Sequence, residues 1–215
     1  MPRVSEAHLA ARRQQILEAA WRCFARQGFH ATSMQDVFAE SGLSAGAVYR
    51  YFPSKKELVR VTAETILGSI DVFFDQQLAA ADPSPPAQLV ERLTTKVVEL
   101  ATHDDVDRTR IALNIWSEAL RDPDVGDIAS TTLRRLRGRF VELAERWQAT
   151  GHLGVDVNPD HVGQVLYGAT VGFIIQRLLT GDVSPQSYRA GVAALAAFRP
   201  TVSVAEVAGG DPQPA

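Results

Sequence analysis

The sequence is short of the features on which secreted and membrane proteins depend. It contains a single cysteine, Cys23, so neither an intramolecular disulfide nor a thiolate metal cluster is expected. No apolar run approaches the roughly 18 residues that a membrane-spanning helix needs. The first residues show no apolar stretch behind a basic one, so we expect no secretory signal. Together these absences favour the cytoplasm and predict no membrane partner.

Motifs that carry catalysis or bind cofactors are also missing from the sequence. It has no nucleophile elbow, no phosphate-binding glycine loop, no spaced set of metal ligands and no paired carboxylates at catalytic spacing. We therefore expect no enzyme, no cofactor and no metal site. Sustained alternation of apolar and polar residues is absent as well, which argues against β-strands.

Charge is distributed unevenly along the chain. Residues 1–60 contain nine Lys and Arg against five Asp and Glu, a balance of +4. The remainder contains 13 basic and 20 acidic residues, a balance of −7. A basic end on an acidic body suits a protein that touches a polyanion with one end only. The alternative is a chance fluctuation in composition.

Helical periodicity recurs along the chain, and breaker residues divide it into about nine helices. Ser33 and Ser54 each precede an acidic residue by three positions, the spacing of a capping box. Glycines end several helices, and pairs of a polar residue with proline open others. The expected helices lie up to residue 28 and at about 33–41, 44–51, 55–80, 87–100, 104–120, 123–150, 159–180 and 186–198.

Two short helices separated by Gly42-Leu43 form a candidate helix-turn-helix. The second of them begins with Ser44-Ala45-Gly46-Ala47. Small residues let the N-terminus of a helix approach the major groove closely, and its free backbone N–H groups can bond to phosphate. Arg50 then supplies a guanidinium, and Tyr49 and Tyr51 supply hydroxyl groups. The segment therefore predicts a DNA-reading unit.

The DNA-reading unit lies within two longer segments, Gly28-Phe29-His30-Ala31-Thr32-Ser33-Met34 and Val37-Phe38-Ala39-Glu40-Ser41-Gly42-Leu43-Ser44-Ala45-Gly46-Ala47-Val48-Tyr49-Arg50-Tyr51-Phe52-Pro53-Ser54-Lys55-Lys56-Glu57-Leu58. These segments closely resemble the DNA-binding signature of the tetracycline-repressor (TetR) family of bacterial transcriptional regulators. The likeness covers roughly residues 10–60, and the rest of the chain matches the family only in length and helical layout. Phe38 is bulkier than the residue usual in the family, and Tyr51 stands where histidine is common.

The resemblance implies three kinds of DNA contact. The expected phosphate contacts, at the start of the second helix and after the Ser54 cap, are Thr32, Ser33 and Lys55. The expected base contacts, on the third helix, are Ala45, Gly46 and Arg50. The residues that would hold the DNA backbone are Tyr49 and Tyr51, and Ser44 is a further expected phosphate contact. The alternatives are a solvated Arg50 and ordinary half-buried tyrosines.

Beyond the DNA-reading unit, the resemblance implies a pocket among the fourth to eighth helices for a small, largely apolar inducer. Helix phase selects aromatic residues for its wall and amide or carboxyl side chains for its polar contacts. The expected wall residues are Trp116, Tyr167 and Phe173, and the expected polar residues are Asn114, Glu118, Gln164 and Gln176. For the aromatic residues, plain core packing is the alternative.

The last two helices predict a dimer interface. The helix at about 159–180 contains glycines, each of which lowers helix propensity by about 1 kcal/mol relative to alanine. Close approach of another helix would offset that cost. The helix at about 186–198 is almost bare of charge and rich in alanine. As in the family, both would pack against a second copy; burial within one subunit is the alternative.

These observations predict an all-α protein in two domains. A helix-turn-helix domain at 1–56 would be joined by a long helix to a ligand-binding and dimerisation domain at 57–200, followed by a disordered tail at 201–215. The expected function is a ligand-responsive transcriptional regulator, most simply a repressor that a small inducer releases from a palindromic operator. The alternatives are control by a protein partner or by no ligand, and an all-helical enzyme or carrier.

Overall fold

The computed structural model describes residues 6–102 and 106–198, and over these residues the chain forms nine helices and no strand. The expected all-α fold is confirmed. The predicted tail at 201–215 lies outside the described residues. The helices are α1 (Glu6–Ala31), α2 (Met34–Ser41), α3 (Ala45–Tyr49), α4 (Lys55–Ala79), α5 (Pro86–Thr102), α6 (Arg108–Ala119), α7 (Pro123–Ala149), α8 (Pro159–Leu179) and α9 (Pro185–Ala196).

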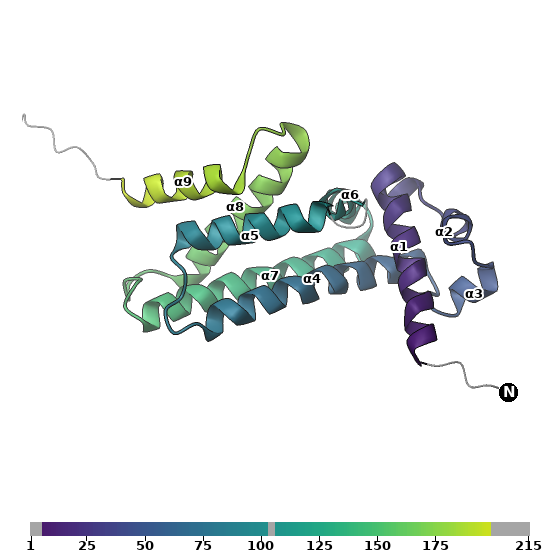
Figure 1. Ribbon diagram of the computed structural model, residues 1–215, viewed down its shortest axis with the longest axis horizontal. Coiled ribbons are helices and arrows are strands. Elements are labelled where there is room, and N and C mark those ends of the chain that lie inside the picture. The colour runs from purple at the N-terminus through teal and green to yellow at the C-terminus, as the bar shows by residue number, and fades with distance from the viewer. Residues whose placement is uncertain (1–5, 103–105, 199–215) are drawn as a thin grey trace, which may run out of the picture.

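The helices are arranged as a small lobe at one end of a longer body (Figure 1). α1, α2 and α3 make up the lobe. In the body, α4 packs beside α7, α8 packs against α7 and α5, and α9 lies along α5. α6 lies at the junction, where it packs against α1 of the lobe and α7 of the body. The lobe is therefore held to the body by α6 as well as by the continuous chain entering α4.

Serine caps fix where the helices around the lobe begin. The Ser33 hydroxyl accepts a hydrogen bond from the Asp36 N–H (3.2 Å), and the Ser33 N–H donates to the Asp36 carboxylate (2.7 Å). This confirms the expected capping box. At the start of α4 only half of the expected box forms. Ser54 accepts from the Glu57 N–H, but the Glu57 carboxylate binds Arg60 instead of returning to the cap.

Gly28 ends the regular part of α1, as expected, because its backbone leaves the helical conformation. Its φ of 80° lies in the region that favours glycine, and a short further turn after it runs to Ala31. α3 is shorter than expected and ends at Tyr49. The chain there tightens into a turn and then meets Pro53, and the residue before a proline avoids the helical region.

The lobe and the junction share one hydrophobic core. Its buried members come from all three helices of the lobe, the segment following α3, the start of α4, and α6 and α7. They include Trp21, Phe24, Val37, Val48, Phe52, Leu58, Ile111, Ile115 and Val125. A second cluster fills the body and includes Phe74, Leu89, Phe140, Trp147 and Leu166. Residues on both sides of position 56, such as Phe52 and Leu58, belong to the first of these clusters, and the division into two domains stays a prediction.

α8 is the one helix in the described ranges that is long and apolar enough to cross a membrane, with a mean hydropathy of 1.3. The sequence was expected to hold no such segment. Length and composition alone also select the packing helices of soluble proteins, and α8 packs along α7 and α5. Only 22% of its apolar window is buried, so this packing accounts for part of its apolar character.

The contact between α8 and α7 is very close at Gly163. A Cβ added there would stand 2.7 Å from Val141 Cγ2 and 3.1 Å from the Val141 backbone nitrogen. We expect Gly163→Ala to lower the free energy of unfolding by about 1–3 kcal/mol, because overpacking forces the two helices apart. Urea denaturation followed by circular dichroism measures the change.

The matched control is Gly68→Ala on α4, where an added Cβ meets nothing within 4 Å. There the better helix propensity of alanine should raise stability by up to about 1 kcal/mol. If both substitutions change stability equally and in the same direction, the close α7–α8 contact does not exist.

Candidate nucleic-acid interface

The N-terminus of α3 is open to solvent and made of small residues. Ser44, Ala45 and Gly46 are all exposed, and a Cβ added at Gly46 meets nothing within 4 Å. The Ser44 hydroxyl caps the helix by accepting from the Ala47 N–H (3.4 Å). Backbone N–H groups at such an end attract anions. This end of α3 can therefore approach a polyanion without steric obstruction from its own side chains.

Two larger polar side chains follow, Tyr49 at the end of α3 and Arg50 directly after it. Tyr49 is 48% exposed, and its ring meets the Phe38 ring edge-on at a centroid distance of 5.3 Å. Phe38, the unusually bulky residue of α2, therefore positions Tyr49. Arg50 is exposed, and within the described ranges no carboxylate pairs with it. Its guanidinium is thus available to an external acceptor.

The remaining predicted DNA contacts near α2 and α3 differ in accessibility. Ser33 is exposed at the start of α2. Thr32 is only 1% exposed, and its hydroxyl donates to the Gly28 carbonyl (2.7 Å). Tyr51 is half-buried and packs against the core of the lobe. The structure therefore brings Ser44 to Arg50 together on one surface and turns Thr32 inward.

Lys55 is also turned inward, toward the end of α1. Its ammonium donates to the carbonyls of Phe29 (2.8 Å) and Thr32 (2.7 Å) and lies 4.3 Å from the centre of the Phe29 ring. Burial lowers the pKa of this ammonium, against the opposing effect of Glu118. Lys55 thus ties the last turn of α1 to the start of α4, and its role as a phosphate contact stays a prediction.

Sequence analysis did not predict the ion pairs that connect α2 to α1. Arg22 Nε and Arg26 Nη1 lie 2.7 Å and 3.2 Å from the Glu40 carboxylate. The hydrogen bond from Arg22 is the main reason that the pKa of Glu40 is lowered. The four-residue spacing of the two arginines places them on one helix face, but it does not identify the carboxylate they meet.

Of the predicted pocket residues, two line an apolar cavity in the body. Trp116 borders a cavity of about 120 Å³ enclosed by α4, α5, α6, α7 and α8. It also borders a neighbouring cavity of about 50 Å³, where Tyr167 joins it. Most of the other lining residues are aliphatic and come from five different helices.

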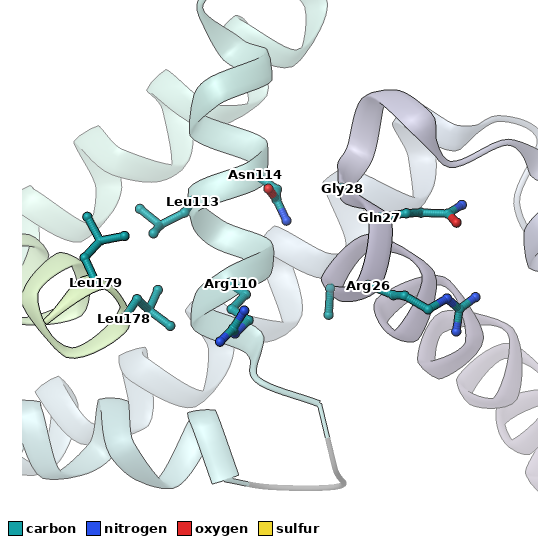
Figure 2. Close-up of a pocket in the computed structure, with 9 residues that line it drawn as sticks. Arg26, Gln27, Gly28, Arg110, Leu113, Asn114, Leu178 and Leu179 are labelled. Carbon is teal, nitrogen blue, oxygen red and sulfur yellow. The ribbon is translucent and has the colours of Figure 1, made fainter. Parts of the chain in front are cut away.

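Two predicted polar residues of α6 face the lobe instead of the cavity. Asn114 donates from Nδ2 to the Phe24 carbonyl (3.1 Å), and the Glu118 carboxylate lies 3.5 Å from His30 Nδ1. Figure 2 shows Asn114 pointing from α6 toward Gly28, across an open cleft of about 370 Å³. These two side chains therefore join α6 to α1.

The other predicted pocket residues are engaged around α8. Phe173 is fully buried against the Tyr188 ring, with centroids 5.0 Å apart. Gln176 donates to the Tyr188 hydroxyl (2.7 Å), and Gln164 donates to Asp160 (2.6 Å). None of the three lines the apolar cavity of the described chain. Gln164 lines a separate surface pocket together with Tyr167, and the roles of these three residues in ligand binding stay predictions.

Comparison with known proteins identifies two families on the chain. Residues 16–62 match the bacterial regulatory proteins of the tetR family, and residues 86–198 match the C-terminal region of BetI-type transcriptional repressors. A solved structure of a transcriptional regulator from Saccharomonospora viridis, in complex with choline, is 26% identical with a TM-score of 0.62. That alignment covers 86% of this chain and 95% of the other.

Two curated relatives are similar in sequence. The transcriptional repressor Rv1474c of Mycobacterium tuberculosis is 32% identical over 148 residues, which cover 64% of this chain and 71% of that protein. The regulator YfiR of Bacillus subtilis is 43% identical over 89 residues, which span 41% of this chain and only 40% of that protein. The match at residues 86–198 covers more than half of the chain, and the match at 16–62 covers the DNA-reading region. The chain therefore belongs to the TetR family of bacterial regulatory proteins.

Proposed function

We propose that this protein is a cytoplasmic, homodimeric repressor that binds a palindromic operator and is released from it by a small, largely apolar molecule. The observation that carries the proposal is the open N-terminus of α3, where Ser44, Ala45 and Gly46 leave room for the major groove. Arg50 and Tyr49 are exposed beside it. Contacts through Thr32, Tyr51 and Lys55 remain predictions, and Ser33 is the accessible candidate at the start of α2.

The exposed faces of α8 and α9 support the dimer. Val165 is 71% exposed and Leu195 is 78% exposed, although both are aliphatic. α9 has no buried residue in the isolated chain. Apolar surface of this kind gains free energy when a second copy covers it. Dimerisation would place two copies of α3 about one DNA turn apart, the spacing at which both read one operator.

The cavity in the body favours control by a small molecule over control by a protein partner. It is lined by α4 and α6, and both helices also pack against α1 of the lobe. A ligand that displaces either helix would change the separation of the two readers and weaken operator binding. The choline complex of the Saccharomonospora viridis regulator supports small-molecule binding in a related body.

Operator binding is the first test. Fluorescence anisotropy of the purified protein should detect selective binding to DNA from upstream of its own gene. Affinity should fall steeply with salt, because phosphate contacts release counterions. The control is random DNA of the same length. Equal affinity for random DNA and for every sequence enriched from a random pool would contradict the proposed reader.

Arg50 should contribute to the choice of sequence. Replacing it by alanine is expected to cost about 1–3 kcal/mol on the preferred operator and to relax discrimination at one base pair. Competition titrations with operators changed at single positions measure the loss. The matched control is Arg60→Ala on α4, since Arg60 pairs with Glu57 and Glu64. Identical discrimination by the two variants would remove Arg50 from the reader.

The dimer surface can be tested with two valine substitutions. Val165→Glu places a carboxylate in the proposed interface, where its desolvation should shift the protein to monomers. Val72→Glu is the matched control, because Val72 is 57% exposed on α4, away from the α8 and α9 surface. Sedimentation velocity reports the mass of each variant. A Val165→Glu protein that stays fully dimeric would rule out this part of α8 as the interface.

A further inference from the structure

The cations in and around the lobe fall into two groups according to their partners. Several are neutralised by carboxylates: Arg22 and Arg26 pair with Glu40, Lys56 with Asp122 and Asp124, and Arg60 with Glu57 and Glu64. Arg12, Arg13 and Arg50 form no ion pair with any carboxylate of the described residues. Arg50 already belongs to the proposed reader, so Arg12 and Arg13 of α1 are the charges that the proposed function leaves unused.

Arg12 is held beside the start of α3. Its Nη1 donates a hydrogen bond to Gln15 Oε1 (2.8 Å), and Gln15 Nε2 donates in turn to the carbonyl of Ser41 (2.8 Å). Ser41 is the last residue of α2 and lies three positions before Ser44, the cap of α3. Because a guanidinium has five N–H donors, its bond to Gln15 orients Arg12 and leaves other donors for an external acceptor.

Arg13 is exposed and lies beside the other end of α3. Its guanidinium carbon is 5.2 Å from the centre of the Phe52 ring. Phe52 is fully buried, and its N–H donates to the carbonyl of Val48 on α3 (3.0 Å). The pKa of nearby Glu57 is lowered chiefly by its hydrogen bonds from Arg60, with Arg13 as a further cause. Arg60 therefore holds that carboxylate, and Arg13 keeps its donors for another partner.

We infer that Arg12 and Arg13 bind DNA phosphates that border the major groove entered by α3. This inference rests on the proposed function and extends its contact surface from the helix-turn-helix to the first turns of α1. A helix in the major groove lies between two phosphate backbones. Two arginines placed near the two ends of that helix are suited to reach them, and arginine binds phosphate oxygens through charge-assisted hydrogen bonds.

The two arginines of α1 differ in role from Arg50. Phosphate contacts fix the orientation and register of a protein on DNA, but they carry no sequence information. Through Gln15, Arg12 is connected to the backbone of Ser41 at the turn between α2 and α3. A phosphate bound by Arg12 therefore fixes the position of α3 in the groove, while Arg50 contributes to the choice of bases.

The salt dependence of affinity tests the inference on the full chain. The slope of log affinity against log salt concentration decreases in magnitude by about 0.9 for each phosphate contact that is lost. Arg12→Gln and Arg13→Gln should each cause that decrease, which amounts to about eightfold in affinity for each tenfold change in salt. The decrease should be the same on the preferred operator and on random DNA, because both present the same phosphates. Fluorescence anisotropy over a series of salt concentrations measures it.

Arg26→Gln is the matched control on the same helix, since Arg26 pairs with Glu40. Its slope should equal that of the unmodified protein, and an equal decrease in this variant would reduce the effect to net charge and overturn the inference. Arg12→Lys and Arg13→Lys should keep the full slope, because lysine binds phosphate as a point charge. If Arg13→Gln fails to fold, Arg13→Met removes the same charge and keeps an apolar chain over Phe52.

The outcomes separate this inference from the function on which it rests. Selective operator binding by the unmodified protein, combined with unchanged slopes in the Arg12 and Arg13 variants, would refute the α1 contacts and leave the regulator intact. Equal affinity of the unmodified protein for all sequences would refute the regulator instead. A variant that loses affinity on the preferred operator but not on random DNA would place its arginine among the base contacts and refute its phosphate role.

Discussion

The packing of α6 against α1 is the constraint on which the rest of the structure depends. Ile111 and Ile115 of α6 are buried in the same core as Trp21 and Phe24 of α1. Asn114 adds a hydrogen bond to the Phe24 carbonyl across this contact. Close-packed cores do not deform continuously but shift between discrete arrangements. A displacement of α6 must therefore be accommodated by the lobe, and the lobe must move as a unit with α3.

Most of the fold could be predicted because its signals are local. Serine caps, left-handed glycines and proline pairs mark helix ends within a few residues of sequence, and the nine expected helices were found in the described chain. The regular part of α1 ends at Gly28 as expected, and the unpredicted feature is the short turn that follows it. The carbonyls of Phe29 in that turn and of Thr32 just after it accept hydrogen bonds from Lys55 at the start of α4. A contact over that sequence distance has no local signature.

The candidate site shows the same contrast between local and long-range signals. The reader at Ser44 to Arg50 is contiguous, so its exposed face follows from the helix-turn-helix pattern. The cavity is built from five helices, and its walls are ordinary aliphatic residues such as Ile66 and Ala112. Nothing in their chemistry distinguishes them from core residues. Helix phase therefore selected conspicuous polar residues such as Asn114 and Glu118, whose partners turned out to lie on α1.

α8 explains why ligand, stability and assembly are difficult to separate in this architecture. Gly163 meets α7, Ile174 lines both cavities, and Val165 faces outward where a second copy is proposed to pack. Because α8 has contacts on three sides, a ligand that displaces it on one side must also disturb its contacts on the other two. Because α7 and the proposed partner hold α8 in place, we expect a ligand to displace α4 and α6 more easily than α8. Those are the two helices whose far ends reach the lobe, so the strain of ligand binding is directed toward the reader.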